Sequence, residues 1–549
     1  MKKKFLFFLN SALFILNCNA QWSSNPAVNN AICTATEDQV APQLISDGTG
    51  GTIIIWGDYR NGSYDIYAQR IDANGVEQWL ANGVAVCTAI GDQGAPQLIS
   101  DGVGGAIITW RDGRIDLNNN DIYAQRINAN GVGQWLANGV AVCTAIGSQG
   151  VPQLISDGSG GAIITWSDAR SGTVLTSGDI YAQRINANGV GQWLANGVAV
   201  CTVTGNQGSP QLISDGSGGV IISWWDYRSG SSQVYVQRIN ANGVGQWLAN
   251  GVAVCTAIGY QGAPQLISDG AGGVIISWVD NRSGNHDIYT QRINANGVGQ
   301  WLANGVAVCT AIDNQDIPQL ISDGAGGAIF TWEDLRSGSY HIYAQRINAN
   351  GVVQWLANGV AVCTATYYQL SPLLISDGAG GAIITWEGII SVGTNDIYAQ
   401  RINANGVEQW LANGVAVSTA LNNQSYHQII SDGAGGAIFT WEDLRSGSSH
   451  IYAQNICADG SLGTCLTVGI NEEENNSLTI YPNPTTSEIN VNGYSPAYLK
   501  LCNMLGQTVA EATKTNKLYL GNLPQGLYVL QLFDEKGGLV KAEKVIVAE

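Results

Sequence analysis

The stretch APQLISDGAGGVIISWVDNRSGNHDIYTQRINANGVGQWLANGVAVCTAIDNQ, from Ala263 to Gln315, is one complete copy of a repeat that fills most of the chain. The copies align on one tryptophan, and successive tryptophans are 54, 56, 58, 54, 54, 54 and 55 residues apart. A repeat of this length means that one unit, and the way its copies stack, decides the fold. The aligned residues are Trp56, Trp110, Trp166, Trp224, Trp278, Trp332, Trp386 and Trp441.

Each copy predicts four short strands. They are PQLIS, GAIITW, DIYAQRI and a fourth around QW and VAVC, and the SDGxGG turn, a variable loop and the NANG turn separate them. The second strand is apolar at successive positions, as in Ile107, Ile108 and Trp110, so both of its faces must be covered. A four-stranded sheet that packs between two like sheets is a propeller blade.

The two ends of the array complement each other. Gln21 to Ala35 matches only the fourth strand, and the last copy stops after Ile451–Gly460, where its own fourth strand should begin. A closed ring explains this offset, whereas an open β-solenoid, the alternative, does not. We therefore predict an all-β chain, with an eight-bladed β-propeller closed by an N-terminal strand over residues 21–465 and a small C-terminal β-sandwich.

Charge and an N-terminal segment indicate the compartment. Residues 21–465 hold 15 Arg, no Lys and 33 acidic residues, a net charge of −18, which repels nucleic acid and anionic lipid. Residues 1–20 have three lysines, an apolar run from Phe5 to Leu16 and small residues at Cys18 and Ala20, as in a secretory signal peptide. A lipoprotein is the alternative, but Asn17 is a poor residue before a lipidated cysteine. No later stretch predicts a transmembrane segment.

The cysteines fall into two groups. Seven occupy one position in the fourth strand, on separate blades too far apart for disulfides, and we expect small buried hydrophobic residues there. Cys457 and Cys465 instead flank one turn and are a candidate disulfide. The repeated position holds Cys33, Cys87, Cys143, Cys201, Cys255, Cys309 and Cys363, with Ser418 as the eighth.

After the repeats and an expected linker over residues 466–476, the composition changes. Residues 477–549 contain YPNP, LGQ and LPQGLY motifs among short alternating strands. This region resembles the type A C-terminal sorting domain of the type IX secretion system of Bacteroidetes. The resemblance implies that the secretion machinery is a partner and that the protein is secreted or held at the outer cell surface. The residues that carry it include Pro482, Asn483, Pro484, Gly506, Gly526, Tyr528 and Lys544.

The repeats contain an acid beside a base, in the pattern W-x-D-x-R, but seven copies of it argue against an active site. We expect a charge-assisted bond that holds each loop between the second and third strands. His341 and His450 replace an aspartate in two copies and are expected to anchor loops. No cofactor, metal site or catalytic residue is predicted; the insertion Asp116–Asp121 resembles a calcium loop only weakly, because it lacks the glycine and the distal glutamate.

Two loops of each copy vary, the one before the first strand and the one after the second, and they open on the same face. The leading hypothesis is a binding or adhesion module for an extracellular glycan or protein on this face. The alternatives are a polysaccharide-active enzyme, which needs two carboxylates in one pocket at the channel mouth, and a passive surface scaffold. The candidate ligand-binding aromatics are Tyr260, Tyr367, Tyr368, Tyr426 and Trp225, with the best patch at Tyr367, Tyr368 and Tyr426.

Overall fold

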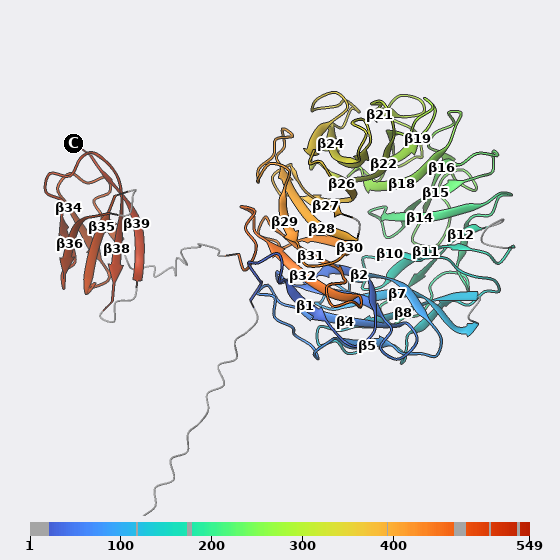
Figure 1. Ribbon diagram of the computed structural model, residues 1–549, viewed down its shortest axis with the longest axis horizontal. Helices are drawn as coiled ribbons and strands as arrows, with labels where there is room; N and C mark the ends of the chain where they lie inside the picture. Colours follow the sequence, from blue (N-terminus) through green and yellow to red (C-terminus); the bar gives the residue numbers. More distant parts are fainter. Residues whose placement is uncertain are drawn as a thin grey trace, which may run out of the picture. The chain divides into compact units, whose positions relative to one another are not determined.

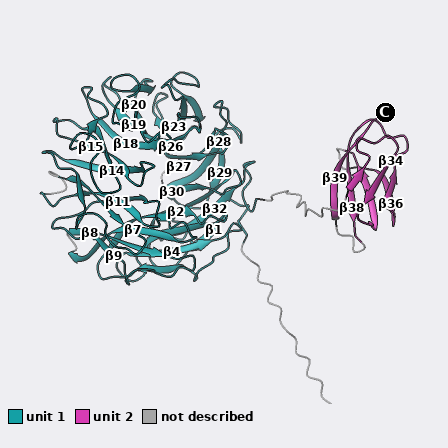
Figure 2. Ribbon diagram, turned by 180° about the vertical axis from the view of Figure 1, so that it is seen from behind, with its two compact units in different colours: residues 1–465 teal, residues 466–549 magenta. Residues whose placement is uncertain are grey.

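A computed structural model describes residues 21–116, 119–172, 178–391, 393–465, 479–503, 507–534 and 539–548. The chain divides into two compact units, residues 1–465 and 466–549 (Figure 2). The expected signal peptide and the expected linker lie outside the described residues.

The first unit consists of eight four-stranded antiparallel sheets, and Figure 1 shows them arranged around a common centre. In seven of these sheets the four strands are consecutive in the chain, and in the eighth the first strand of the chain joins the last three strands of the unit. The inner strands lie side by side around the centre. They are β2 (Gln39–Ser46), β6 (Gln93–Ser100), β10 (Gln153–Ser156), β14 (Gln207–Ser214), β18 (Gln261–Ser268), β22 (Gln315–Ser322), β26 (Tyr368–Ser376) and β30 (Gln424–Ser431).

The other three positions of each sheet follow in chain order toward the outside. The second strands are β3 (Thr52–Asp58), β7 (Ala106–Asp116), β11 (Ala162–Asp168), β15 (Val220–Asp226), β19 (Val274–Asp280), β23 (Ala328–Asp334), β27 (Ala382–Ser391) and β31 (Ala437–Asp443). The third strands are β4 (Asp65–Ile71), β8 (Asn119–Ile127), β12 (Asp179–Ile185), β16 (Gln233–Ile239), β20 (Asp287–Ile293), β24 (His341–Ile347), β28 (Thr394–Ile402) and β32 (His450–Ile456). The outer strands are β5 (Val84–Cys87), β9 (Val140–Cys143), β13 (Val198–Cys201), β17 (Val252–Ala253), β21 (Val306–Cys309), β25 (Val360–Cys363), β29 (Val415–Ser418) and, for the eighth sheet, β1 (Asn30–Cys33).

The eighth sheet is built from both ends of the array. β1 pairs with β32 and aligns Asn30 with Ala453. Arg445 reinforces the junction, because its Nη1 donates to the carbonyl oxygen of Val28 at 2.6 Å. β2 lies against both β30 and β6, so the sheets form a closed, propeller-like ring.

The core consists of layers between neighbouring sheets. Every residue of β3 is buried, as the apolar run of the second strand predicts. Trp110 of the second sheet packs against Ile53 and Ile55 of the first, and the equivalent contact recurs around the ring. Large indole rings thus fill the space between sheets that diverge from the centre.

The fourth strand is shorter than the sequence predicts. VAVC forms the strand, whereas the preceding Gln-Trp step lies outside it. The indole of Trp79 instead crosses to the next sheet, where its Nε1 donates to the carbonyl oxygen of Ala129 at 3.0 Å. Gly131 permits this approach, because it has a φ of +75° and a Cβ there would lie 2.9 Å from the Trp79 ring.

The second unit contains two antiparallel sheets that share one core. Its strands are β33 (Thr479–Tyr481), β34 (Glu488–Asn492), β35 (Tyr498–Cys502), β36 (Thr508–Thr513), β37 (Lys517–Tyr519), β38 (Gly526–Phe533) and β39 (Leu539–Val547). The sheet orders are β33-β34-β37 and β36-β35-β38-β39. Ile489 of the first sheet and Leu501 and Leu530 of the second meet in the core.

Candidate functional site

The two variable loops of each sheet meet at one end of the ring, as expected. The amide of Tyr59, after β3, donates to the carbonyl oxygen of Asp38, before β2, at 2.9 Å. The same bond joins Tyr227 to Asn206 in the fourth sheet and Leu335 to Asn314 in the sixth, at 2.9 Å each. We call this end of the ring the variable face.

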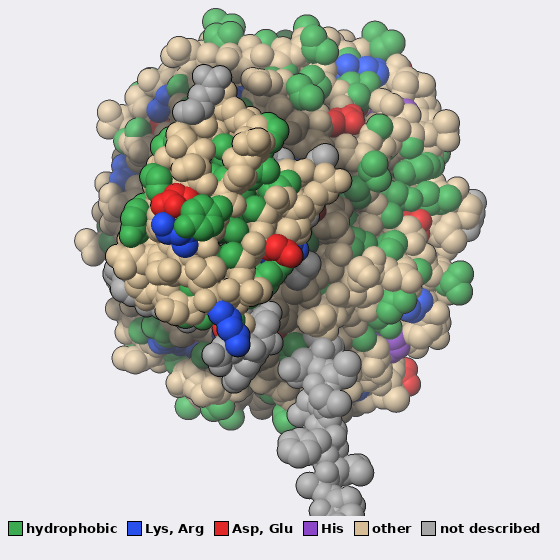
Figure 3. All heavy atoms as spheres, turned by 90° about the vertical axis from the view of Figure 1, so that its left-hand side faces the viewer, with side chains coloured by type: hydrophobic (Ala, Val, Ile, Leu, Met, Phe, Trp, Pro, Cys, Tyr) green, Lys and Arg blue, Asp and Glu red, His purple; other side chains and the backbone are tan. Residues whose placement is uncertain are grey.

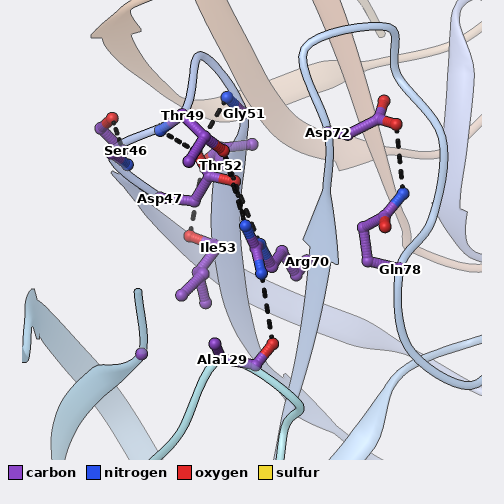
Figure 4. Close-up of polar contacts among 12 residues, drawn as sticks. Ser46, Asp47, Thr49, Gly51, Thr52, Ile53, Arg70, Asp72, Gln78 and Ala129 are labelled. Atoms are coloured by element: carbon purple, nitrogen blue, oxygen red, sulfur yellow. Dashed lines mark hydrogen bonds and ion pairs between the residues drawn. The ribbon is translucent and has the colours of Figure 1, made fainter. Parts of the chain in front are cut away.

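The opposite end carries the nearly constant turns and is built alike in each copy. Figure 4 shows it in the first sheet, where Asp47 Oδ1 accepts from the amides of Thr49 and Gly51 at 2.8 and 2.9 Å. Asp47 Oδ2 accepts from Arg70, whose Nη1 donates to the carbonyl oxygen of Ala129 in the next sheet at 3.3 Å. Cavities of about 410 and 430 Å³ between these turns are lined by equivalent residues, so they do not distinguish one sector from another.

The W-x-D-x-R motif forms a latch that holds a loop of the variable face. In the third sheet, Asp168 Oδ2 accepts from Trp166 Nε1 and from Arg170 Nη2, both at 2.7 Å. The Arg170 guanidinium lies 3.7 Å from the ring centroid of Tyr181 and donates to the Sγ of Cys143 on the preceding sheet at 3.3 Å. Seven sheets contain this Asp–Arg pair, which supports a structural role.

The repeated cysteines are buried, but their position is not purely apolar. Six of the thiols accept a bond from the latch arginine of the next sheet, as Cys143 does. Burial raises the pKa of the Cys143 thiol to about 12. Cys457 and Cys465 form a disulfide in the structure, with Cα atoms 5.3 Å apart.

The two histidines that we expected to anchor loops contact the next sheet. His341 Nδ1 lies 2.8 Å from Gln369 Oε1, and His450 Nδ1 lies 2.8 Å from Gln39 Oε1 across the ring junction. Each glutamine lies at the start of an inner strand, Gln39 first in β2 and Gln369 second in β26, so the imidazole fixes a loop to the neighbouring sheet. These contacts agree with a loop-anchoring role for both histidines.

Aromatic side chains follow one arc of the variable face, over the fourth to eighth sheets. The ring of Trp225 lies 5.7 Å from that of Tyr227, Tyr260 lies 5.9 Å from His286, and Tyr340 lies 6.5 Å from Tyr368 (ring centroids). We call the five rings Tyr227, Tyr260, Tyr340, Tyr368 and Tyr426 the aromatic arc. Tyr368 is 49% exposed and Tyr426 is 66% exposed.

Tyr367, the third residue of the predicted patch, has a different environment. It is half-buried, and its ring lies 5.8 Å from that of Tyr398. A Cβ added to Gly388 would lie 2.7 Å from the Tyr367 ring, so this ring fills the space where other sheets have the latch aspartate. Burial raises the pKa of Tyr367, as expected for a phenol packed against another ring.

A cavity of about 480 Å³ opens on the variable face at the inner strands of the sixth, seventh and eighth sheets. Gln319 of β22, Ser371 of β26 and Gln428 of β30 line it, together with side chains from β27 and β28. Its volume lies within the range of small-molecule sites. Its other lining residues are Ile317, Pro372, Leu373, Glu387, Asn395, Ser425, Tyr426 and His427.

Three glutamates occupy the x position of W-x-D in consecutive sheets, and each reaches the next inner strand. Glu333 accepts from the amide of Ser371 at 2.6 Å, Glu387 from that of Tyr426 at 3.0 Å, and Glu442 from that of Ala41 at 2.7 Å. Burial raises the pKa of Glu333 to about 7, and repulsion from Asp316 and Glu387 adds to the effect. Burial also raises the pKa of Glu442.

His427 is the most unusual group in the cavity wall. It is 2% exposed, and neither ring nitrogen has a hydrogen-bond partner. Its Nδ1 lies 3.6 Å from Glu387 Oε1, which is too long for a hydrogen bond. A buried polar group without a partner costs about 1–3 kcal/mol, so its presence in the cavity wall calls for an explanation.

Sequence reasoning identified Tyr426 but missed Glu387 and His427. Both were visible as departures from the repeat, because the x position reads Gly57, Arg111 and Ser167 in the first three copies and glutamate in the last three. His427 stands where the other seven copies have proline. The repeat made these positions look structural, whereas the exceptions to it line the cavity.

The sorting-motif residues cluster in the second unit. The Asn483 side chain donates to the carbonyl oxygen of Lys544 at 2.7 Å and accepts from the amide of Ile546 at 2.9 Å. Tyr528 donates its hydroxyl to the carbonyl oxygen of Pro524 at 2.8 Å. The YPNP and LPQGLY motifs thus fix the ends of β38 and β39, while Gly506 lies outside the described residues.

The described part of the chain contains no cluster of three or more His, Cys, Asp or Glu side chains placed to hold a metal ion. The insertion that weakly resembles a calcium loop lies partly outside the described residues, at residues 117–118.

None of the described segments forms a helix with the length and apolarity of a membrane span. On the face that Figure 3 shows, hydrophobic side chains are scattered and charged ones are sparse.

A family model described as a secretion system C-terminal sorting domain matches residues 479–548. Those residues are a secretion sorting domain. The match confirms the resemblance drawn from YPNP and LPQGLY, and it implies export to the outer surface or beyond, with the secretion machinery as a partner. No curated protein sequence matches the chain.

Three of the solved structures that resemble this chain are distant from it. An ulvan lyase bound to a sulfated disaccharide unit has 10% identity and a TM-score of 0.43, over 80% of this chain and 98% of that one. An endo-arabinase from Bacteroides thetaiotaomicron has 16% identity and a TM-score of 0.27, over 44% and 92%. A puromycin-hydrolysing peptidase from Mycobacterium tuberculosis has 11% identity and a TM-score of 0.40, over 77% and 61%. At these scores none of them bears on activity.

Proposed function

We propose that residues 21–465 form an eight-bladed β-propeller that binds an extracellular polymer, a glycan or a protein, after the C-terminal domain, a small β-sandwich, has directed its export. The observation that carries this proposal is the coincidence of the aromatic arc with the 480 Å³ cavity on one face. Exposed rigid rings beside a concave site supply contact area at a small entropic cost.

An extended ligand fits this arrangement better than a small one. The aromatic arc spans several sheets, and the cavity lies at the end where Tyr426 is most exposed. A polymer could follow the arc with one unit inserted in the cavity. The opposite face offers constant turns in every sector, which gives a ligand no preferred position.

A two-carboxylate glycoside hydrolase is less well supported. Among the described residues that line the cavity, Glu387 is the one carboxylate. Hydrolysis by a carboxylate pair needs two such groups facing one bond. Binding, display and adhesion are therefore the activities that we assign to this face.

Tyr426→Ala tests the proposal with little risk to the fold. Tyr426 has a φ of +53°, and alanine occupies the equivalent bulge position at Ala41, Ala95 and Ala263 with φ values of +51°, +50° and +49°. The full chain and this variant should be compared on arrays of extracellular glycans and proteins. We expect the variant to fold and to lose at least tenfold in affinity for the polymer that the parent binds.

Replacing Val103, an exposed residue in the constant turn after β6, by alanine is the control. Unchanged affinity in Tyr426→Ala, or an equal loss in Val103→Ala, would show that the ligand does not use the aromatic arc.

A further inference from the structure

We propose that the cavity at Glu387 recognises the protonated amine of an amino sugar within that polymer. This inference rests on the proposed function and adds the chemistry of the ligand unit. Three features carry it: a carboxylate without a matching cation in the cavity wall, a buried imidazole with free ring nitrogens, and a wall that mixes amide and hydroxyl groups with apolar side chains.

The unbalanced charge is local. Among the described residues that line the cavity, Glu387 is the one carboxylate, and none is arginine or lysine. Seven arginines of the repeat are bound to latch aspartates, and seven more are bound to aspartates at the constant turns. Residues 21–465 contain no lysine. A cationic ligand is therefore the natural counter-charge in this sector.

The histidine supplies the second observation. His427 is almost completely buried, lines the cavity and leaves both ring nitrogens without a hydrogen-bond partner. In its neutral form an imidazole offers one donor and one acceptor. An ammonium group that binds Glu387 would also be within reach of the acceptor nitrogen, because the two side chains are 3.6 Å apart.

The remaining wall favours a sugar over the side chain of a basic peptide. Gln319, Gln428 and Asn395 provide amide donors and acceptors, and Ser425 provides a hydroxyl. Ile317, Pro372 and Leu373 lie among these groups. A hexose ring carries several hydroxyls and apolar C–H faces, so it matches this mixed wall, whereas a lysine side chain has one polar group. The exposed Tyr426 ring at the cavity offers a flat surface on which a pyranose can stack.

The test uses the full chain and compares two probes with the same sugar backbone, one with free amines and one in which an acetyl group neutralises each amine. A β-1,4-linked tetramer of glucosamine and its fully N-acetylated form should be titrated calorimetrically at pH 6, at low and at high salt. We expect the amino tetramer to bind at least tenfold more tightly, and the difference to shrink at high salt. A tetralysine peptide serves as the third probe and should bind at least tenfold more weakly than the amino tetramer.

Three variants locate the effect. Glu387→Gln keeps the acceptor for the Tyr426 amide and removes the charge, so it should abolish the preference for the amine. Glu442→Gln changes the equivalent residue of the next sheet, which does not line the cavity, and should leave most of the preference. His427→Pro restores the residue of the other seven copies and should fold. It should weaken binding of the amino tetramer at least fivefold.

Equal binding of the two tetramers, or an unchanged preference in Glu387→Gln, would overturn the inference. Tetralysine binding that equals the amino tetramer would assign the cavity to a basic peptide instead. If neither tetramer binds but Tyr426→Ala weakens another polymer, this inference fails while the proposed function stands. If Tyr426→Ala alters no binding, both fail.

Discussion

Seven of the eight sheets hold the loop after their second strand with an Asp–Arg latch. The exception is the seventh sheet in chain order, which has Gly388 in place of the aspartate. Its Trp386 Nε1 is consequently buried without an acceptor, and the ring of Tyr367 fills the space. The same sheet supplies Glu387 to the cavity, and the next sheet supplies Tyr426 and His427. Several departures from the repeat therefore lie in one sector, and residues of that sector line the cavity.

This contrast separates two kinds of residue. Constant positions stabilise contacts between sheets, and changing one should reduce stability without altering ligand preference. Changing a variable position in the seventh or eighth sheet should alter ligand preference with little loss of stability, because other copies already tolerate different residues there.

Opening the ring should have the largest effect. Removing residues 21–35 takes away β1 and leaves β32 as an unpaired edge, which invites aggregation. It also removes the carbonyl of Val28 and the side chain of Asn29, which bind Arg445. We expect a lower melting temperature and increased light scattering on heating.

Removing residues 466–549 is the matched truncation. We expect it to leave the melting of the first unit unchanged, because that unit has its own cores between sheets. A truncation of residues 21–35 that melts like the parent would contradict ring closure by β1.

Breaking one latch should have the next largest effect. Asp168→Ala removes the acceptor for Trp166 Nε1 and leaves Arg170 without its buried counter-charge. We expect a loss of about 3–5 kcal/mol in the free energy of unfolding, measured by denaturant titration. Ser167→Ala, in the same motif, should cost less than about 0.5 kcal/mol. Equal effects of the two substitutions would show that the latch contributes nothing specific.

The sequence predicted the ring because the repeat has a clear period and complementary ends. The apolar run at Ile107 and Ile108 correctly indicated a strand that is covered on both faces. The Gln-Trp step was misassigned to the fourth strand, because nothing in the spacing shows that Trp79 donates to a turn of the next sheet.

The site was predicted only in part, for a related reason. Tyr426 stood out as an aromatic in a variable loop, but contacts between strands of different sheets have no local sequence signal. The Glu387 carboxylate accepts a hydrogen bond from the amide of Tyr426, which lies 39 residues later in the chain. Comparison of the copies with one another would have identified Glu387 and His427, since both depart from otherwise regular positions.

A smaller effect is expected from the ionisation of Glu333. The folded chain keeps a proton on this carboxyl up to a pKa of about 7, whereas the ordinary value is 4.5. The unfolded chain releases that proton at lower pH, so stability should decrease as pH rises from about 4.5 to 7. With about 1.4 kcal/mol per tenfold change in proton affinity, the loss is on the order of 2–3 kcal/mol.

Glu333→Gln should flatten this part of the stability profile, because glutamine does not titrate. Denaturant titrations at pH 4.5, 5.5, 6.5 and 7.5 would measure it. Glu37→Gln, which changes an exposed carboxylate, should follow the parent profile. A parent profile as flat as that of Glu333→Gln would mean that Glu333 is not desolvated in the folded chain.

The smallest effect should come from the repeated cysteine position. Cys143→Ser keeps an acceptor for Arg170 Nη2 and loses some apolar contact, so we expect a cost of less than about 1 kcal/mol. The seventh sheet already has Ser418 at this position, in β29, and its hydroxyl donates to Asn29 Oδ1 at 2.9 Å. A loss above about 2 kcal/mol would instead mean that the thiol packs more tightly than the arginine contact requires.

Because the seven thiols are buried on separate sheets, mild reductant should affect the stability of the parent and of Cys143→Ser equally.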